Sequence, residues 1–292
     1  MIQANDVVVQ AGGRTLLDGI NCTLQPGELL CVLGANGAGK STLLSALCGD
    51  HRLHRGTVTL DGIPLSRYRA GELATRRAVM PQSSHLGFPF QSREVVELGR
   101  MPFNEPRAVT QQATRECLSL TATTHLTRAR YPALSGGEKQ RIQLARVLAQ
   151  LWPFTAGSTR YLFLDEATAS LDPLHQQQVF SLARQLSQRG LGVMAVVHDM
   201  NLASRFADRL LLLKDGQVLA AGPPDEVMSP NLIAEAFAGL KTRIVADAED
   251  GRPWIQPLSE QNGPTLSRHS GETHSPVAHC KNPATEGLAF QA

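Results

Sequence analysis

A glycine-rich segment near the start of the chain has the residue types that bind phosphate groups. It follows the pattern G-x-x-x-x-G-K-[ST] between an apolar run and a helix-forming run. Glycines let backbone N–H groups curl around phosphates, and the helix N-terminus adds a favourable potential for the anion. The lysine would neutralise β- and γ-phosphate charge, the serine would ligate Mg²⁺ and the threonine would bond an α-phosphate oxygen. The predicted nucleotide-binding residues are Gly34, Ala35, Asn36, Gly37, Ala38, Gly39, Lys40, Ser41 and Thr42.

Two neighbouring acids follow the apolar run 161–164. In open α/β sheets, ligands bind beyond the carboxyl ends of the strands, so Asp165 and Glu166 are expected at such a site. Asp165 suits the Mg²⁺ shell through water, and Glu166 suits a general base that polarises the attacking water. In isolation, two acids that simply begin a loop would be an equally good interpretation. The phosphate-binding segment favours the catalytic one.

A third segment, 134–141, has the sequence LSGGEKQR. It predicts a helix start with Ser135 as N-cap and Glu138 at the third helical position, the pattern of a capping box. A capping box does not account for Gly136 and Gly137, because consecutive glycines cost helix stability. They indicate that the backbone approaches another group closely there.

The chain resembles an ABC-transporter ATPase subunit over about residues 1–258. The motifs that carry the resemblance follow one another along the chain in the family's order: the phosphate-binding segment, LSGGEKQR, the strand with the two acids, Ser170-Leu171-Asp172 and His198. The resemblance implies binding and hydrolysis of ATP. It also implies that Ser135, Gly136 and Gly137, in a signature with Glu138, contact the γ-phosphate of an ATP held by a second copy. One chain has one set of motifs, so the expected enzyme is a head-to-tail homodimer with two ATPs.

The same resemblance assigns roles to three further positions. His198 would hold the γ-phosphate and the attacking water, although a lone histidine is more often structural. Gln82 would reach Mg²⁺ and the water, and Asp172 would lie in the loop that links the two sites of the dimer. The predicted catalytic residues are therefore Glu166, His198 and Gln82, and the predicted metal-binding residues are Ser41, Gln82 and Asp165.

Two positions depart from the family pattern. Gln10-Ala11 precede the first Gly-Gly turn, where the family has an adenine-stacking aromatic residue. Base stacking is therefore expected to fall to Arg14 or to be absent. Ala167 replaces the proline that usually follows the catalytic glutamate. Neither acid is altered, so hydrolysis is expected to survive.

The apolar pattern predicts the elements that position these residues. Residues 1–25 alternate like antiparallel strands around Gly12-Gly13, and 28–33 is a continuous apolar run typical of a buried strand. The run 57–60 before Asp61-Gly62 predicts another short strand with a turn. Strands at 161–164, 193–197 and 210–213 alternate with helical stretches, the rhythm of a parallel sheet. Four prolines between Pro81 and Pro106 favour loop and short helix there, and 110–151 is helical in composition.

The expected fold is α/β, a P-loop NTPase (RecA-like) core with an antiparallel β subdomain and an inserted α-helical subdomain. The predicted ABC ATPase domain spans 1–240, with the helical insert at about 86–155 and a C-terminal extension at 241–258. Residues 259–292 are rich in Ser, Thr, Gly, Pro, Asn and His, and a disordered tail is predicted. The tail contains His269, His274, His279 and Cys280, whose spacing fits no common metal site.

The composition excludes several classes of protein. With 28 basic and 26 acidic residues, the net charge of +2 argues against a nucleic-acid binder with a large basic surface. Apolar runs are too short to span a membrane, and the first ten residues lack the pattern of a secretory signal. The five scattered cysteines are expected to be buried thiols in a reducing compartment. The predicted location is the cytoplasmic face of the inner membrane, as a peripheral subunit.

The segment 81–100 contains Phe-Pro-Phe, Val-Val and Leu-Gly-Arg runs, and resembles the permease-binding surface of importers for iron chelates, heme and cobalamin. Within that group, Tyr131-Pro132, the run 145–152 and the spacer 153–160 look most like hemin import ATP-binding proteins. The implied partners are a second copy, two transmembrane permease subunits and, indirectly, a periplasmic heme-binding protein. Two alternatives stay open: the same role for ferric siderophore or cobalamin, and a soluble ABC ATPase that acts on ribosomes or DNA.

Overall fold

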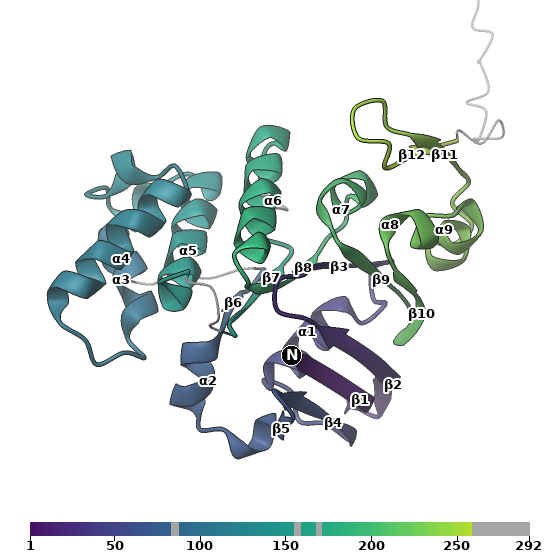
Figure 1. Cartoon of the computed structure of the whole chain (residues 1–292), viewed down its shortest axis with the longest axis horizontal. Helices are drawn as coiled ribbons and strands as arrows, with labels where there is room; N and C mark the ends of the chain where they lie inside the picture. The colour runs from purple at the N-terminus through teal and green to yellow at the C-terminus, as the bar shows by residue number, and fades with distance from the viewer. Residues whose placement is uncertain (83–87, 155–158, 168–170, 259–292) are drawn as a thin grey trace, which may run out of the picture. The chain divides into compact units, whose positions relative to one another are not determined.

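A central six-stranded sheet positions most of the residues with predicted chemistry, which lie at or just after the ends of its strands (Figure 1). Its order is β10-β9-β3-β8-β7-β6, and every pairing is parallel except that of β10 with β9. All residues of β3 and β8 are buried, as expected of strands covered on both faces. The strands are β3 (Leu29–Gly34), β6 (Arg77–Met80), β7 (Tyr161–Asp165), β8 (Gly192–Val196), β9 (Arg209–Lys214) and β10 (Gln217–Gly222).

The computed structural model describes residues 1–82, 88–154, 159–167 and 171–258. Within them, Met1–Leu258 form one unit. The predicted disordered tail, with its three histidines and Cys280, lies outside the described residues, as does Ser170. Those predictions stay untested.

A second, antiparallel sheet forms from the N-terminal part of the chain, with the order β2-β1-β4-β5. Gly12 and Gly13 make the turn that pairs Ala11 with Arg14, as the alternating pattern predicted. Helix α1 (Lys40–Cys48) packs between this sheet and the central one, and side chains of all three share one apolar cluster. The strands are β1 (Ile2–Ala11), β2 (Arg14–Leu24), β4 (Arg55–Leu60) and β5 (Ile63–Pro64).

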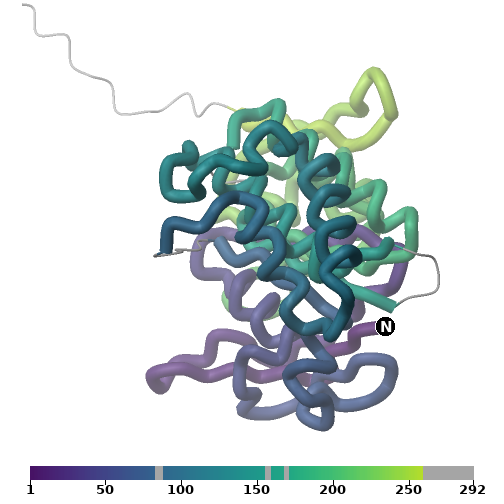
Figure 2. The backbone as a smooth tube through the Cα atoms, turned by 90° about the vertical axis from the view of Figure 1, so that its left-hand side faces the viewer, coloured from purple at the N-terminus to yellow at the C-terminus, as the bar shows by residue number. Residues whose placement is uncertain are grey.

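A helical lobe is inserted between β6 and β7, where the prolines and the helical composition predicted loops and helices. In Figure 2 these helices lie toward the viewer, with the N-terminal strands below them. The long helix α5 packs against α3, α4 and β6 and so joins the lobe to the central sheet. The helices are α2 (Ala70–Arg76), directly before β6, and α3 (Ser92–Glu97), α4 (Arg107–Leu120) and α5 (Gly136–Leu151).

Arg100 ties the start of this lobe to the end of α5. Its side chain is only 4% exposed and forms an ion pair with Glu105 at 2.6 Å. The guanidinium also donates to the carbonyl oxygens of Ala149 at 2.6 Å and Trp152 at 2.8 Å. Its Cζ lies 3.9 Å from the centroid of the Phe103 ring. A buried arginine with all these partners fixes the geometry of the lobe.

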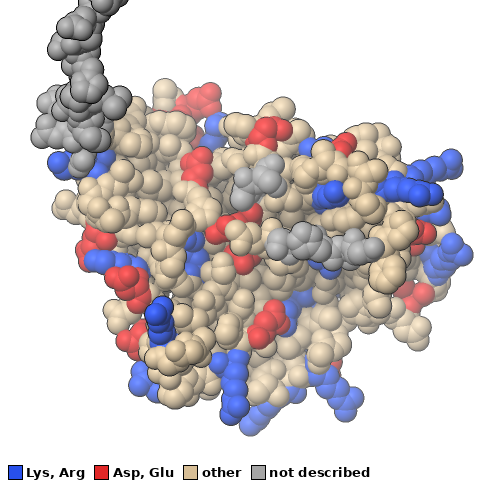
Figure 3. Space-filling view, turned by 180° about the vertical axis from the view of Figure 1, so that it is seen from behind, with Lys and Arg blue, Asp and Glu red and all other residues tan. Residues whose placement is uncertain are grey.

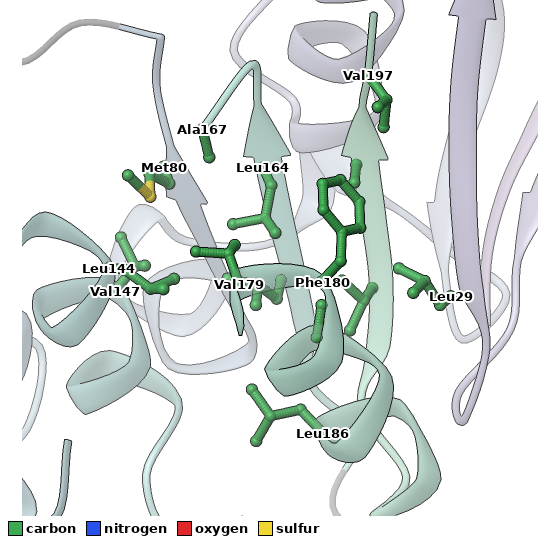
Figure 4. Close-up of a cluster of buried hydrophobic side chains, with 14 of the residues drawn as sticks. Leu29, Met80, Leu144, Val147, Leu164, Ala167, Val179, Phe180, Leu186 and Val197 are labelled. Carbon is green, nitrogen blue, oxygen red and sulfur yellow. The ribbon is translucent and has the colours of Figure 1, made fainter. Parts of the chain in front are cut away.

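Helix α6 (Pro173–Gln188) covers one face of the central sheet. Figure 4 shows Val179 and Phe180 directed at the strands that lead to Leu164 and Val197. Side chains from α5 join the same cluster, so the sheet, α5 and α6 share one core. Helix α7 (Met200–Phe206) begins just after β8 and packs beside α6.

The C-terminal extension is a β-hairpin, which the sequence analysis did not predict. Strands β11 (Thr242–Ala246) and β12 (Pro253–Pro257) pair with each other, and the turn between them contains Gly251 with φ of +72°. Its sequence signal was the Asp-Gly pair at 250–251 between two short apolar runs. Helices α8 (Pro224–Val227) and α9 (Pro230–Ala236) lead from β10 into the hairpin.

The surface and the cysteines agree with the composition. On the face drawn in Figure 3, Lys and Arg side chains are interspersed with Asp and Glu side chains. In the described part of the chain, no helix has the length and apolarity that a membrane span requires. Cys31, Cys48 and Cys117 are buried free thiols, as predicted, whereas Cys22 is half-buried.

Candidate active site

The phosphate-binding segment forms a tight loop between β3 and α1. Gly34 has φ of +151°, and a Cβ there would lie 2.4 Å from the carbonyl oxygen of Leu213. Gly39 has φ of +99°, and its Cβ would lie 2.9 Å from the carbonyl oxygen of Leu16. Both positions therefore require glycine for steric reasons. No side chain caps the N-terminus of α1, which leaves its first N–H groups available to an anion.

Lys40 folds back over this loop. Its ammonium donates hydrogen bonds to the carbonyl oxygens of Gly34 at 2.8 Å and Ala35 at 3.0 Å, and the residue is only 6% exposed. Burial lowers the pKa of Lys40, while the nearby carboxylates of Glu166 and Asp165 act in the opposite direction. The loop thus holds a cation beside the space that phosphates would occupy.

Ser41 and Asp165 face each other across the edge of the sheet. The Ser41 hydroxyl donates to Asp165 Oδ1 at 2.9 Å. Burial raises the pKa of Asp165, and the hydrogen bond from Ser41 opposes that shift. Mg²⁺ prefers oxygen ligands and keeps several of its waters. A hydroxyl beside a carboxylate therefore fits an ion that Ser41 would ligate directly and Asp165 would hold through water.

Glu166 leaves the strand in an unusual backbone conformation. Its φ of +47° lies in the left-handed region, which a residue with a Cβ rarely adopts. Its carboxylate is held on both oxygens: Gln82 Nε2 donates to Oε2 at 2.5 Å, and His198 Nε2 lies 2.6 Å from Oε1. The side chain is 14% exposed. The structure thus brings all three predicted catalytic residues together.

The topology explains why these three residues meet. Gln82 follows β6, Glu166 follows β7 and His198 follows β8, and these are three adjacent parallel strands. Their carboxyl ends open onto the same edge of the sheet, where ligands of α/β proteins bind. Lys40 and Ser41 follow β3, which neighbours β8. One edge of the sheet therefore collects the predicted phosphate, metal and catalytic groups.

The signature segment begins α5 as the sequence predicted. Ser135 is the N-cap: its N–H donates to Glu138 Oε2 at 2.8 Å, and its Oγ accepts from Glu138 N at 3.4 Å. A Cβ on Gly136 would meet nothing within 4 Å, and one on Gly137 would only touch Leu171 at 3.4 Å. Nothing within the described part of this chain therefore requires glycine at 136.

The signature and the phosphate-binding loop belong to different parts of one chain. Figure 1 shows α5 among the helices of the lobe, whereas α1 lies below the central sheet. Asp172 begins α6 as its N-cap: Oδ1 accepts from the backbone N–H of His175 at 3.0 Å, and Oδ2 lies 2.5 Å from His175 Nδ1. These hydrogen bonds hold the pKa of Asp172 below its ordinary value.

Comparison with known proteins identifies the family. The model of the ABC transporter family matches residues 17–169. The chain belongs to the ABC transporter family. Over 260 residues it is 47% identical to the hemin import ATP-binding protein HmuV of Gloeobacter violaceus, covering 88% of this chain and 94% of that protein. The protein of the same name from Pseudomonas aeruginosa is 45% identical over 255 residues, covering 87% of this chain and 99% of the relative.

Solved structures of ABC transporter cassettes share the fold. One is a dimeric bacterial cassette, 26% identical, with a TM-score of 0.67 over 76% of this chain and 98% of that one. Another is the same cassette, also dimeric, in a post-hydrolysis state with bound ADP and phosphate, 25% identical, with a TM-score of 0.66 and the same coverage. The predicted fold class is confirmed: an ABC ATPase with an α/β P-loop core.

The two departures from the ABC family pattern have distinct surroundings. Gln10 and Arg14 are exposed at the β1–β2 turn, where Gln10 Nε2 donates to Thr15 Oγ1 at 3.3 Å. The assignment of base stacking to Arg14 stays a prediction. Ala167 is only 4% exposed and lies in the core cluster of Figure 4. A methyl group thus fills the position after Glu166.

The residue that starts the helix after His198 was not among the predicted site residues. Asp199 is the N-cap of α7, and its Oδ1 accepts from the N–H groups of Asn201 at 2.8 Å and Leu202 at 3.1 Å. An aspartate directly before a helix-forming run is a recognisable N-cap signal. This cap fixes where the helix starts, and therefore how His198 leaves the strand.

Proposed function

We propose that this ABC family member is the ATP-binding and ATP-hydrolysing subunit of an importer that carries hemin across the inner membrane through a permease. The observation that supports this cargo is the identity of 45–47% with hemin import ATP-binding proteins over 87–88% of the chain. The similarity spans the catalytic edge of the sheet and the whole helical lobe. The subunit would lie at the cytoplasmic face of the membrane.

The arrangement at the sheet edge supports ATP hydrolysis. Water attacks the γ-phosphorus in line, the new P–O bond forms, and the bond to the β-phosphate oxygen breaks. Glu166 takes the proton from the water, because its carboxylate is the base at the centre of the cluster. Gln82 and His198 fix the orientation of that carboxylate and contact the water and the γ-phosphate. Most of the rate enhancement then comes from positioning and from charge stabilisation by Lys40.

Ser41 Oγ and the Asp165 carboxylate would hold Mg²⁺, Asp165 through water and with Gln82 nearby. When bound, the ion neutralises charge on the β- and γ-phosphate oxygens. The chain's own contribution is to place an oxygen donor from α1 beside one from the end of β7. Oxygens of the ATP phosphates would complete the coordination.

Two copies are needed for a complete site. The signature residues 135–138 lie in the helical lobe, and Gly136 faces open space within the chain. In a head-to-tail pair, Ser135, Gly136 and Gly137 of one copy would contact the γ-phosphate held by the other, and Asp172 would link the two sites. Both structures described above are of one cassette, which is dimeric in each, and this supports the arrangement. Closure of the dimer on ATP would then drive a conformational change in two permease subunits. A periplasmic heme-binding protein would deliver hemin to that permease.

Two other functions make different predictions. In one, the same subunit serves a permease for ferric siderophore or cobalamin, since cargo is selected by the permease and not by the ATPase. In the other, the chain works without a permease, on ribosomes or DNA. The identity of 45–47% with hemin import ATP-binding proteins over 87–88% of the chain favours transport.

The deciding experiment is reconstitution of the chain with its permease and binding protein in proteoliposomes. ATPase activity is measured with hemin, ferric siderophore or cobalamin supplied to the binding protein. We expect hemin alone to stimulate hydrolysis, and stimulation by another cargo would refute the hemin assignment. Cell fractionation tests the other alternative: retention on membranes that depends on the permease supports transport, whereas co-sedimentation with ribosomes or DNA contradicts it.

A further inference from the structure

One side chain of helix α7 hydrogen-bonds to the C-terminal hairpin in the way that a neighbouring strand would. Asn201 Nδ2 donates to the carbonyl oxygen of Ile255 at 3.1 Å, and the N–H of Ile255 donates to Asn201 Oδ1 at 2.7 Å. Both backbone groups of one β12 residue are thereby satisfied by a single amide. Ile255 itself is 2% exposed and belongs to the main apolar core. The contact is therefore a specific, partly buried one.

Asn201 also lies in the first turn of the helix that follows His198. Helix α7 starts at Met200, and the Asp199 carboxylate caps it by accepting from the N–H of Asn201 at 2.8 Å. His198 comes one residue before the cap and reaches Glu166 at 2.6 Å. The backbone N–H of Asn201 is thus held by Asp199, the residue after His198, while its side chain is held by the hairpin.

We infer that Asn201 is a positioning residue for His198, which holds the imidazole against Glu166 by anchoring the first turn of α7 to the C-terminal hairpin. This rests on the proposed function, in which His198 contacts the γ-phosphate and the water. His198 is 47% exposed, so few neighbours restrain the ring itself. Its orientation then depends on the backbone that follows it, and misplacement of a positioning group by about 1 Å can cost about a hundredfold in rate.

Other contacts keep the hairpin attached without Asn201. Ser204 Oγ donates to the carbonyl oxygen of Pro253 at 2.6 Å, and Arg252 Nη1 donates to the carbonyl oxygens of Ser204 at 2.8 Å and Ala207 at 2.9 Å. These bonds involve the later part of α7, away from His198. Loss of the Asn201 side chain should therefore loosen the first turn while the hairpin stays docked. Ser204→Ala removes a bond of the same kind from the end of α7 that does not face the site, which makes it the matched control.

The test compares steady-state ATPase activity of the full chain in its transporter complex. For Asn201→Ala we expect kcat to fall about tenfold with KM for ATP changed less than about twofold. Ser204→Ala should keep kcat within about twofold of wild type. The melting temperatures of both variants are measured alongside. Wild-type kcat in Asn201→Ala, or an equal loss in Ser204→Ala, would overturn the inference.

A double-mutant cycle tests the route through His198. If Asn201 acts through His198, adding Asn201→Ala to His198→Ala should lower kcat by less than about twofold further. A full additional tenfold loss would show that Asn201 acts elsewhere. If His198→Ala alone has wild-type activity, the catalytic assignment in the proposed function fails instead. Should Asn201→Ala not fold, Asn201→Asp keeps the acceptor for the Ile255 N–H; it should lose part of the activity, and unchanged kcat would refute the inference.

Discussion

Ser41 and Asp165 are 124 positions apart in the sequence, yet the Ser41 hydroxyl donates to the Asp165 carboxylate at 2.9 Å. One residue begins the helix after the phosphate-binding loop, and the other ends strand β7. Burial raises the pKa of Asp165, whereas the hydrogen bond from Ser41 and the charge of Lys40 lower it. A cation bound beside this carboxylate would likewise favour its charged form.

The Asp165 carboxylate should determine how much Mg²⁺ the ATPase needs. Asp165→Asn removes the charge but keeps an oxygen that can accept from Ser41. We expect the Mg²⁺ concentration for half-maximal ATPase activity to rise about tenfold or more, because one anionic partner of the ion is lost. A Mg²⁺ titration at saturating ATP measures it, with the exposed Asp225→Asn as control. An unchanged Mg²⁺ requirement in Asp165→Asn would contradict the metal assignment.

Lys40→Ala should weaken ATP binding strongly. The ammonium is buried over the loop and hydrogen-bonded to two of its carbonyl oxygens, so the variant loses both the cation and the order of the loop. Loss of a buried charge partner of a phosphate costs about 2–5 kcal/mol, which corresponds to a rise of about thirtyfold or more in Kd for ATP. Titration with a fluorescent ATP analogue measures this. The exposed Lys241→Ala is the control, and wild-type affinity in Lys40→Ala would show that the loop does not bind phosphates.

Glu166→Gln separates binding from hydrolysis. Glutamine keeps the shape of the side chain but cannot take a proton, so the rate should fall about a hundredfold or more while ATP still binds. The variant should then accumulate as an ATP-bound dimer, visible by size-exclusion chromatography with ATP and Mg²⁺. Normal turnover by Glu166→Gln would refute its role as the base. Glu226→Gln, which changes an exposed glutamate of α8, should behave like wild type.

The sequence predicted which residues would gather at the edge of the sheet but not the contacts among them. The strand-end positions of Gln82, Glu166 and His198 follow from the order of parallel strands, and this order gives one shared edge. The left-handed φ of Glu166 could not be predicted, because a side chain with a Cβ adopts it only under tertiary constraint. The bond of Asn201 to Ile255 spans 54 positions and depends on where the hairpin docks. No local pattern contains that information.

The burial of Arg100 in the helical lobe could not be predicted from the sequence either. Its sequence neighbourhood indicated only a run shared with importers, whereas the structure makes it the buried centre of an ion pair and two carbonyl bonds. Burial of an arginine is decided by long-range packing, and in most sequences this residue type is exposed. Composition alone therefore gives the wrong expectation for it.

The ion pair of Arg100 predicts a pH dependence of stability. The hydrogen bond from Arg100 holds the pKa of Glu105 below its ordinary value. A carboxyl with a depressed pKa in the folded state stabilises the fold above its unfolded pKa, and that stabilisation is lost as pH falls through the folded pKa. We expect Glu105→Gln to lower the free energy of unfolding by about 3 kcal/mol at pH 7. The difference from wild type should shrink as the pH falls below about 4.5.

Urea unfolding across this pH range checks the pair. Glu249→Gln is the control, because the Arg205–Glu249 pair is exposed and should contribute less than about 1 kcal/mol. Equal losses in the two variants at pH 7 would show that burial of the Arg100 pair adds nothing. A Glu105→Gln deficit that stays constant down to pH 3 would show that the charge of Glu105 is not its source.

Gly136→Ala should raise stability and abolish activity. Alanine is favoured over glycine in a helix by about 1 kcal/mol, and within the chain its Cβ would meet nothing within 4 Å. The isolated subunit should therefore melt at a slightly higher temperature. If Gly136 approaches the γ-phosphate held by a second copy, the added methyl group prevents closure, so ATPase activity and the ATP-dependent dimer should both be lost.

Gly71 provides the matched control for this prediction. It is also a helical glycine, in α2, and a Cβ there would also meet nothing within 4 Å. Gly71→Ala should give the same small gain in melting temperature with wild-type ATPase activity. The two variants share the local helix effect and differ only in the signature position. Loss of activity in Gly136→Ala with an unchanged dimer would mean that the glycine acts within one chain. Full activity would mean that the signature does not contact nucleotide at all.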